Sequence, residues 1–360
     1  MARLVVDSDS DDDYLEDRLR VMRKAKQIRP RTENFEEWDE EAFCMRYRIT
    51  KETALLLLTE IEEHLEYTSD RNSSLNPANQ LLLTLRFYAT GGMQTTIGDC
   101  FGVSKSTTSR IVTKVSGAIA SLRPQFVRMP ETQAEIIAVQ QGFYRLAAFP
   151  RVVGTVDCTH VRIISPGGNA PEEFRNRKGY FSVNVQTVSD AELNVRDIVA
   201  RWPGSVHDST IFNNSTLKAR FMRGDYGNGV LLGDSGYAPT QFLLPPLRNP
   251  VTEEQNLFNE SLIRTRNTVE RQYGVMKRRF PVLALGIRLH LETVEAVIVA
   301  CAVMHNIALQ KGEEEPPQDP ELEDRVNAAI NDGVIPVENQ GVQGQDAMRE
   351  TFINYFRNLL

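Results

Sequence analysis

The chain has 360 residues, 41% hydrophobic and 25% charged, which is an ordinary composition for a folded protein of one elaborated domain or two. No apolar run looks long enough to cross a membrane and no apolar signal segment opens the chain, so we expect no membrane association. The four cysteines are far apart and include no Cys-x-x-Cys pair, which argues against a zinc cluster or disulfide framework and fits a reducing compartment.

The net charge of −7 is unevenly distributed along the chain. Residues 313–360 contain eleven acids and three bases, so the rest of the chain carries about +1. Residues 100–130 contain five bases and no acid, and residues 264–288 contain seven bases and one acid. Because local basic faces contact phosphates, the acidic total does not exclude nucleic-acid binding.

The N-terminal part divides into a segment of 1–49, predicted to be mobile, and an all-helical region of 50–122. The first contains an acidic run, Asp7 to Asp13, and a basic cluster, Arg23 to Arg31, which is either a nuclear-import signal or an exposed helix face. The helical region contains an amphipathic stretch at 50–65 and a second predicted helix at 77–89 that is rich in leucine and aromatic residues. A short helix ending near Phe101, a turn at Gly102 and a longer helix capped by Ser104 follow.

The longer helix has an apolar inner face and a short polar, basic outer face. Such an outer face is what a recognition helix requires in a major groove, so the pattern favours a helix-turn-helix over the other interpretation, a solvated face of a bundle. The candidate DNA contacts on it are Lys105, Arg110 and Lys114.

Residues 123–150 are predicted as a linker with a helix at 131–147, and β-rich patterns begin at residue 151. Three runs, 151–164, 180–189 and 194–202, suggest an antiparallel meander. A helix at 207–221, a buried strand at Leu231 and Leu232, and a proline-broken irregular insertion at 237–262 follow. Then come a helix with an apolar stripe from Leu262 to Leu283 and an apolar core helix at 291–311. The predicted domain therefore spans 151–311, and 312–360 is expected to be an acidic, mostly disordered tail with a small helix at its end.

Three acids stand at positions from which a sheet and a helix can deliver side chains to a cleft. Asp157 lies within a β-rich run, where alternation places it on one face with Val153 and Thr155. Asp234 follows the Leu231 strand, and Glu270 lies at the edge of the apolar stripe of the next helix. A buried carboxylate needs a cation, a hydrogen-bond cage or a metal. Asp234 alone could cap a turn and Glu270 alone could be a solvated helix acid, but together the three favour metal binding.

Basic residues and histidines near these acids are further candidates. Arg266 and Lys277 share the side of Glu270 and are candidate phosphate contacts, as are Arg177 and Lys178. The Ser205-Val-His207-Asp208 segment reads either as a helix start, with Ser205 as the N-cap, or as a supporting or substrate-contacting pair, His207 and Asp208. Two other histidines are expected elsewhere: His160 on the strand face opposite Asp157, and His305 as a hydrogen-bonded core residue.

Six sequence blocks, in order, resemble the PIF/Harbinger transposase family and its transposase-derived nucleases, which have a DDE endonuclease site. They are Val-Asp157-Cys-Thr-His-Val, Asn176-Arg-Lys-Gly-Tyr180, Trp202-Pro-Gly-Ser-Val-His-Asp208, Leu-Gly-Asp234-Ser-Gly-Tyr, Asn-Thr-Val-Glu270-Arg and Met304-His-Asn-Ile307. Thirty-five residues separate Asp234 from Glu270, a spacing usual in that superfamily.

The resemblance implies an α/β fold: an RNase H-like mixed-sheet catalytic domain, with the fourth strand parallel beside the first, preceded by the helical region. It also implies Mg²⁺ or Mn²⁺ as cofactor, with Asp157 bridging two ions, Asp234 holding one and Glu270 the other. Double-stranded DNA would be the substrate, a Myb-like protein a partner and the nucleus the main location, with the cytoplasm and a homo-oligomer left open. The alternative function is a domesticated DNA-binding or partner-binding protein without catalysis.

Overall fold

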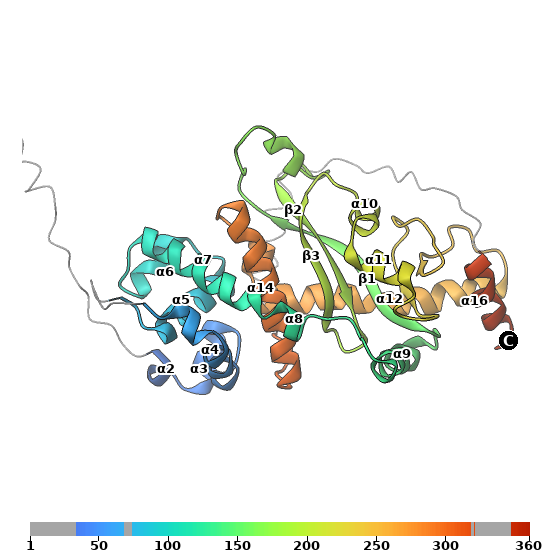
Figure 1. Cartoon of the computed structure of the whole chain (residues 1–360), viewed down its shortest axis with the longest axis horizontal. Coiled ribbons are helices and arrows are strands. Elements are labelled where there is room, and N and C mark those ends of the chain that lie inside the picture. Colours follow the sequence, from blue (N-terminus) through green and yellow to red (C-terminus); the bar gives the residue numbers. More distant parts are fainter. Residues whose placement is uncertain (1–33, 68–73, 318–319, 321–346) are drawn as a thin grey trace, which may run out of the picture.

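The computed structural model describes residues 34–67, 74–317, 320 and 347–360 (Figure 1). Its centre is a five-stranded mixed sheet of order β3-β2-β1-β4-β5. Strands β1 (Val152–Arg162), β2 (Ser182–Ser189) and β3 (Val195–Pro203) form the predicted antiparallel meander. Strand β4 (Val230–Leu232) lies parallel beside β1, which confirms the strand order implied by the family resemblance. Strand β5 (Leu243–Leu244) was not predicted, because two residues are too short to show alternation.

An irregularity near the start of β1 decides which side chains face which layer. The pairing of β1 with β4 shifts register between Val152 and Gly154. As a result Val153 packs in the same cluster as Val156, whereas the Thr155 hydroxyl contacts Thr268 at 2.7 Å on the opposite face. The prediction that Val153 shares a face with Asp157 is therefore wrong, since a bulge interrupts simple alternation.

Replacing Gly154 with alanine is expected to lower the free energy of unfolding by about 1–3 kcal/mol. A Cβ at this position would lie 2.4 Å from a methyl carbon of Val188, so the strands would have to shift. Denaturant unfolding would measure the effect. Gly117→Ala is the control, because nothing lies within 4 Å of a Cβ there. Equal stability of the two variants would contradict the expected clash.

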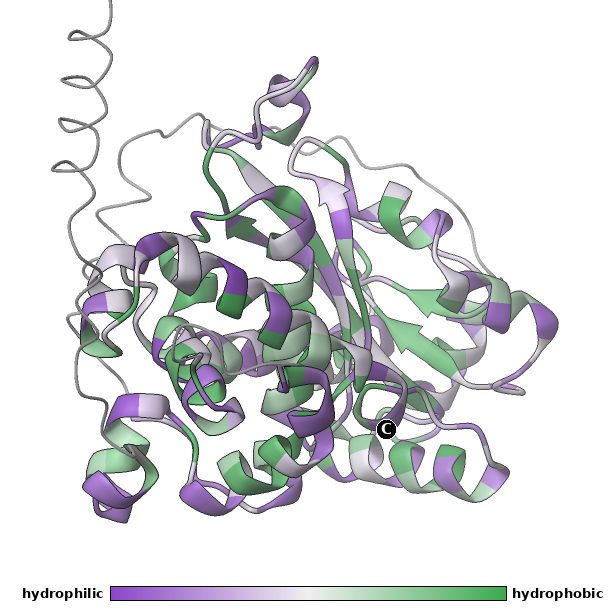
Figure 2. Ribbon diagram, turned by 60° about the vertical axis from the view of Figure 1, so that its left-hand side comes forward, coloured by the Kyte–Doolittle hydropathy of each residue, from purple (hydrophilic) through white to green (hydrophobic). Residues whose placement is uncertain are grey.

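Helices cover both faces of the sheet (Figure 1). The long α12 (Glu253–Arg279) and α14 (Leu291–Gln310) pack on one face, sharing a core with Val183 and Val185 of β2. The opposite face is covered by α10 (Asp208–Asn213) and α11 (Thr216–Arg223), which pack near Val188. Helix α9 (Gln133–Ala147) lies against β1 and α12. The three long strands carry both hydrophobic and hydrophilic residues, and the helices likewise show hydrophobic and hydrophilic faces (Figure 2).

Two predicted helix boundaries are wrong. The single helix expected at 207–221 is broken after Asn213, where the Ser215 hydroxyl accepts the Lys218 amide at 3.1 Å and starts α11. The irregular insertion ends at residue 252, ten residues before its expected end. There Thr252 and Gln255 form a capping box at the start of α12.

Seven helices precede α9 in the described part of the chain, and the first two correct the predicted mobile segment. Residues 34–49 contain α2 (Asn34–Glu37) and α3 (Glu40–Tyr47), and their Phe43, Tyr47 and Ile49 side chains are buried. The acidic run and basic cluster before residue 34 lie outside the described residues. The remaining elements are α4 (Lys51–Leu65), α5 (Pro77–Thr90), α6 (Gln94–Cys100), α7 (Lys105–Ser121) and α8 (Arg123–Phe126). Helix α7 packs on α14, so the helical region and the sheet share a hydrophobic core.

Helix α14 corrects the expectation that no apolar run is long enough to span a membrane. Within the described chain it alone passes that test of length and composition, but 72% of its apolar window is buried inside the protein, as in a core helix. His305 lies there and its ring nitrogen contacts the Leu193 carbonyl at 2.9 Å, which confirms it as a hydrogen-bonded core histidine. Burial lowers the His305 pKa to about 4, so the ring stays neutral near pH 7.

The described parts of the tail also differ from a disordered segment. Helix α16 (Ala347–Arg357) begins before the predicted terminal helix, and its Phe352 and Phe356 rings lie 5.2 Å and 5.7 Å from the Phe149 ring. Helix α13 (Val282–Leu285) and the 3₁₀ helix η1 (Pro171–Phe174) complete the fold.

Candidate active site

Asp157 lies in β1 beneath α12 and is mostly buried, with a side chain 17% exposed. One carboxylate oxygen accepts the Cys158 amide at 2.8 Å, and the other accepts the Arg266 guanidinium at 3.0 Å. The Tyr273 hydroxyl donates to its backbone carbonyl at 2.8 Å and fixes the strand against the helix. Burial raises the Asp157 pKa to about 6, although Arg266 and the Cys158 amide oppose the rise.

Arg266 joins two of the three predicted acids. It lies one turn before Glu270 on α12, and it donates a hydrogen bond from one guanidinium nitrogen to Asp157 and from another to Glu270. The Arg266 side chain is only 16% exposed, whereas that of Glu270 is 53% exposed. Helix α12 therefore presents Glu270 at the rim of the site, with a guanidinium between it and the strand carboxylate.

Asp234 lies two residues beyond the end of β4, beside the strand that carries Asp157. Its carboxylate accepts the Gly236 amide at 3.0 Å, which shapes the turn after the strand. Burial raises the Asp234 pKa, with a smaller contribution from Asp208, while the Gly236 amide opposes the rise. Arg266 and Glu270 also act on this pKa, so Asp234 lies within electrostatic reach of both. The structure thus brings the three predicted acids to one end of the sheet.

Asp208 is a fourth carboxylate at this place, and its predicted place in a capping box with Ser205 is wrong. Helix α10 begins at Asp208 itself, and its N-cap is His207, two residues after the predicted N-cap Ser205. The Asp208 carboxylate accepts the Asn184 side-chain amide at 2.9 Å. Its charge raises the pKa values of both Asp157 and Asp234. The alternative that remained open, a supporting or substrate-contacting position for Asp208, agrees with this geometry.

The donor set suits a hard divalent cation. Carboxylate oxygens are the ligands that Mg²⁺ and Mn²⁺ prefer, and four acids with one arginine leave the site strongly negative. In the described ranges, however, no three acidic, cysteine or histidine side chains are already arranged around a single metal position. Arg266 contacts two of the acids, Asp157 and Glu270.

A polar pocket of about 450 Å³ opens beside Asp208 and Asp234. His160 lies in it, and its ring contacts the Ser182 hydroxyl at 3.1 Å, while Asp157 faces α12; the predicted opposite orientation of these two residues is confirmed. Burial lowers the His160 pKa to about 4. The pocket is lined by His160, Arg177, Asn184, Gly204, Ser205, Val206, His207, Asp208, Asp234, Ser235 and Gly236.

The basic residues predicted to contact DNA fall into different environments. At the polar pocket, the exposed Arg177 lies against the His207 ring, with 2.8 Å between Nη2 and Nε2. Lys277 donates to the Thr159 hydroxyl at 2.6 Å, and burial together with the charge of Lys178 lowers its pKa to about 8.

On α7, the Lys105 and Arg110 side chains are exposed. Lys114 instead donates to the Leu65 and Glu66 carbonyls at 2.9 and 3.3 Å, which caps the end of α4. Its ammonium group therefore already has backbone partners, whereas a lysine that contacts a phosphate needs an ammonium group open to solvent.

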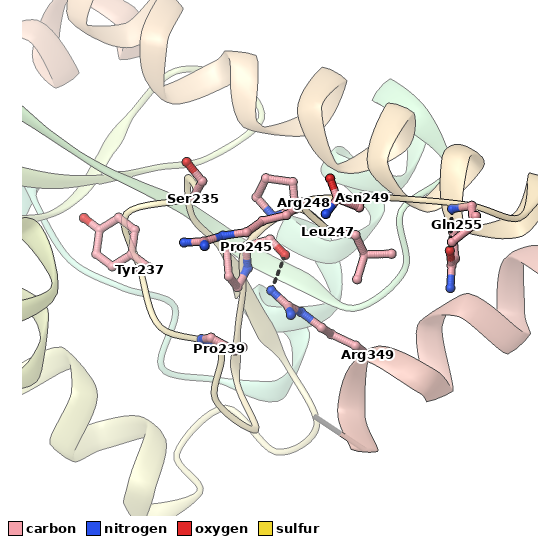
Figure 3. Close-up of a pocket in the computed structure, with 11 residues that line it drawn as sticks. Ser235, Tyr237, Pro239, Pro245, Leu247, Arg248, Asn249, Gln255 and Arg349 are labelled. Carbon is pink, nitrogen blue, oxygen red and sulfur yellow. Dashed lines mark hydrogen bonds between the residues drawn. The ribbon is translucent and has the colours of Figure 1, made fainter. Parts of the chain in front are cut away.

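A second pocket of about 270 Å³ continues from Ser235, which lines both pockets, into the proline-rich segment before α12 (Figure 3). The prolines of this segment predict an irregular insertion but do not indicate a pocket. Arg248 lines it, and Arg349 reaches it from α16 and donates to the Pro245 carbonyl at 3.0 Å. Both pockets therefore have cationic side chains in their lining, Arg177 in the first and Arg248 and Arg349 in the second.

Comparison with known proteins identifies the class first. The sequence profile of the DDE superfamily endonucleases matches residues 156–306, which include all four carboxylates. The human protein named "Putative nuclease HARBI1" is 32% identical over 76% of this chain and 79% of its own length, and the Xenopus laevis protein of that name is 31% identical over 67% and 70%. The Arabidopsis thaliana protein "Antagonist of like heterochromatin protein 1" is 22% identical over 66% and 64%. No solved structure gives a significant match.

The chain therefore belongs to the Harbinger transposase-derived family of DDE superfamily endonucleases. This confirms the family resemblance inferred from the six sequence blocks. The roles of individual residues in the site stay predictions.

Proposed function

We propose that the protein is a divalent-metal-dependent DNA endonuclease of the transposase type, with a two-metal site on an RNase H-like domain. The observation that carries the proposal is the convergence of Asp157, Asp208, Asp234 and Glu270 at one end of the sheet, in a chain of this family. Asp157 would bridge two Mg²⁺ or Mn²⁺ ions, Asp234 would hold one and Glu270 the other. Asp208 supplies a further carboxylate beside Asp234.

Bound divalent ions would neutralise charge on the scissile phosphate and lower the pKa of the attacking water or 3′-hydroxyl. The protein contributes rigid positions for the carboxylates. The Cys158 amide and Tyr273 hydroxyl fix Asp157, the Gly236 amide fixes Asp234, and the Asn184 amide fixes Asp208. Such pre-organisation is what in-line phosphoryl chemistry requires of a protein.

Double-stranded DNA is the proposed substrate. Exposed bases at the start of α7, Lys105 and Arg110, support the helix-turn-helix interpretation, in which α7 would enter the major groove. Arg177 at the polar pocket would contact a phosphate near the acids. We further propose a Myb-like partner and a mainly nuclear location, on the strength of the family alone. A cytoplasmic pool and a homo-oligomer both agree with membership of this family.

A second candidate function is a domesticated DNA-binding or partner-binding protein without catalysis. The observation that favours it is the name of the Arabidopsis relative, which describes an antagonist of another protein instead of a nuclease. The four acids argue for catalysis, because a purely binding role gives no reason to gather repelling carboxylates.

Incubation of supercoiled plasmid with the purified full chain and Mg²⁺ or Mn²⁺ should produce nicked and linear DNA. EDTA should abolish this product, and Asp234→Asn should lower its rate by about a thousandfold or more, since it removes a metal ligand. Asp225→Asn, which alters an exposed acid paired with Arg223, is the control. DNA binding without cleavage, even after addition of a Myb-like partner, would favour the second function.

A further inference from the structure

Arg266 contacts two acids of the site at once, and the proposed chemistry assigns it no role there. Its guanidinium donates to Asp157, on the central strand, and to Glu270, on its own helix. Both of these acids are proposed metal ligands. We propose that Arg266 is an internal counter-cation that occupies these carboxylates before metal binds and must leave them for the metal to enter. This inference rests on the proposed metal-dependent function.

The competition follows from the donor atoms. A carboxylate oxygen that accepts a charge-assisted hydrogen bond from a guanidinium cannot at the same time approach a small divalent ion without repulsion between the two cations. Arg266 and Asp157 are 16% and 17% exposed, so water screens their attraction only partly. The metal therefore has to displace an existing partner, and its apparent affinity is the intrinsic affinity multiplied by the fraction of molecules in which the carboxylates are released.

The local structure lets the arginine move while the ligands stay. Helix α12 is held by buried contacts on either side of Arg266, since the Thr265 hydroxyl donates to the Ser261 carbonyl at 2.7 Å and the Thr268 hydroxyl contacts Thr155. Asp157 keeps its bond from the Cys158 amide independently of Arg266. The exposed position of Glu270 leaves an outward path for the guanidinium.

Displacement would give the arginine a second partner. Once metal takes the carboxylates, the guanidinium is freed beside the site where the scissile strand lies, and a DNA phosphate offers the same bidentate acceptor geometry. Metal binding would then strengthen DNA binding, and by linkage DNA would strengthen metal binding. The arrangement keeps the metal site weak until substrate is present. Arg266 is thus a positioning residue for metal loading.

Calorimetric titration of the full chain with Mn²⁺ alone tests this role. Arg266→Gln should raise the Mn²⁺ affinity by about tenfold, because the competing cation is lost. The matched control is Arg264→Gln, on the same helix, which removes an exposed arginine paired with Glu260 at the same four-residue spacing. This control should leave the affinity unchanged. Asp234→Asn, which does not contact Arg266, should weaken Mn²⁺ binding and so locate the ion.

The possible outcomes separate the two proposals. Weakening by Asp234→Asn together with tighter binding by Arg266→Gln supports both. If Asp234→Asn weakens binding but Arg266→Gln leaves it unchanged or weaker, Arg266 supports the ligands and does not compete with the metal, so the inference fails while the metal site stands. If the Asp234→Asn variant binds Mn²⁺ with the same affinity as the natural chain, the ion lies elsewhere and both proposals are overturned.

Discussion

Replacing Asp157 with asparagine is expected to abolish DNA cleavage and, in metal-free protein, to increase stability at neutral pH. The amide keeps the shape of the side chain but cannot bridge two metal ions, so we expect cleavage of supercoiled plasmid to fall by about a thousandfold or more. The gain in stability follows from the environment of the carboxylate, which burial disfavours in its charged form.

The sign of the stability effect can be worked out from the pKa. The Asp157 pKa rises from 3.8 to about 6 on folding, so between these values the folded state binds more protons than the unfolded state and stability falls as pH increases. The penalty is absent below about pH 4 and complete above about pH 6. A shift of this size corresponds to about 1–3 kcal/mol. Asp157→Asn should therefore exceed the natural chain in unfolding free energy at pH 7.5 and match it near pH 4.

Thermal and denaturant unfolding in EDTA at the two pH values would measure this difference. Asp225→Asn is the comparison, because its exposed carboxylate has a pKa lowered by Arg223 and its removal should not stabilise the protein. A variant at Asp157 that is less stable than the natural chain at pH 7.5 would show that the ion pair with Arg266 outweighs burial. Stability gained at the cost of activity is the usual signature of a functional carboxylate.

The sequence predicted those features that depend on local pattern. Alternation and turn residues indicated the three-stranded meander, and Ser104 was recognised as the cap of α7, where its hydroxyl accepts the Thr107 amide at 3.2 Å. The positions of Asp157, Asp234 and Glu270 relative to strand, strand end and helix were also predicted from pattern. Their gathering at one place depended on the family resemblance, because periodicity does not determine the order of strands in a sheet.

The features that were missed depend on contacts between distant segments. The bulge at Val153 arises from pairing with a strand almost eighty residues away, so the local pattern could not reveal that the side chain changes face. Asp208 was left open between a helix cap and a supporting or substrate-contacting role, because the segment fits a cap pattern, and the bond that holds its carboxylate comes from Asn184 of β2. Arg266 was taken as a phosphate contact, since its bond to Asp157 spans 109 residues.

The acidic tail was also misjudged at its first residues, and this leads to the second large prediction. Glu313 lies against α12 and α4, with a side chain only 5% exposed beside Arg279, which is 3% exposed. Its carboxylate accepts the Arg279 guanidinium at 2.6 Å and both the amide and the hydroxyl of Thr50. Arg279 also donates to the Arg48 carbonyl, so this pair joins the helical region, α12 and the chain beyond α14.

Glu313→Ala is expected to lower the unfolding free energy by about 3–5 kcal/mol, because it leaves Arg279 charged and buried without its partner. Glu314→Ala, one residue further on at an exposed position, should change the unfolding free energy by less than about 0.5 kcal/mol. The double replacement Arg279→Met with Glu313→Leu should recover much of the loss, since apolar side chains can fill the same volume without an unpaired charge. Denaturant unfolding of the natural chain and the three variants would measure these differences. If Glu313→Ala is no less stable than Glu314→Ala, the pair does not hold the helical region to the sheet domain, and their other contacts, including the shared apolar core, would do so.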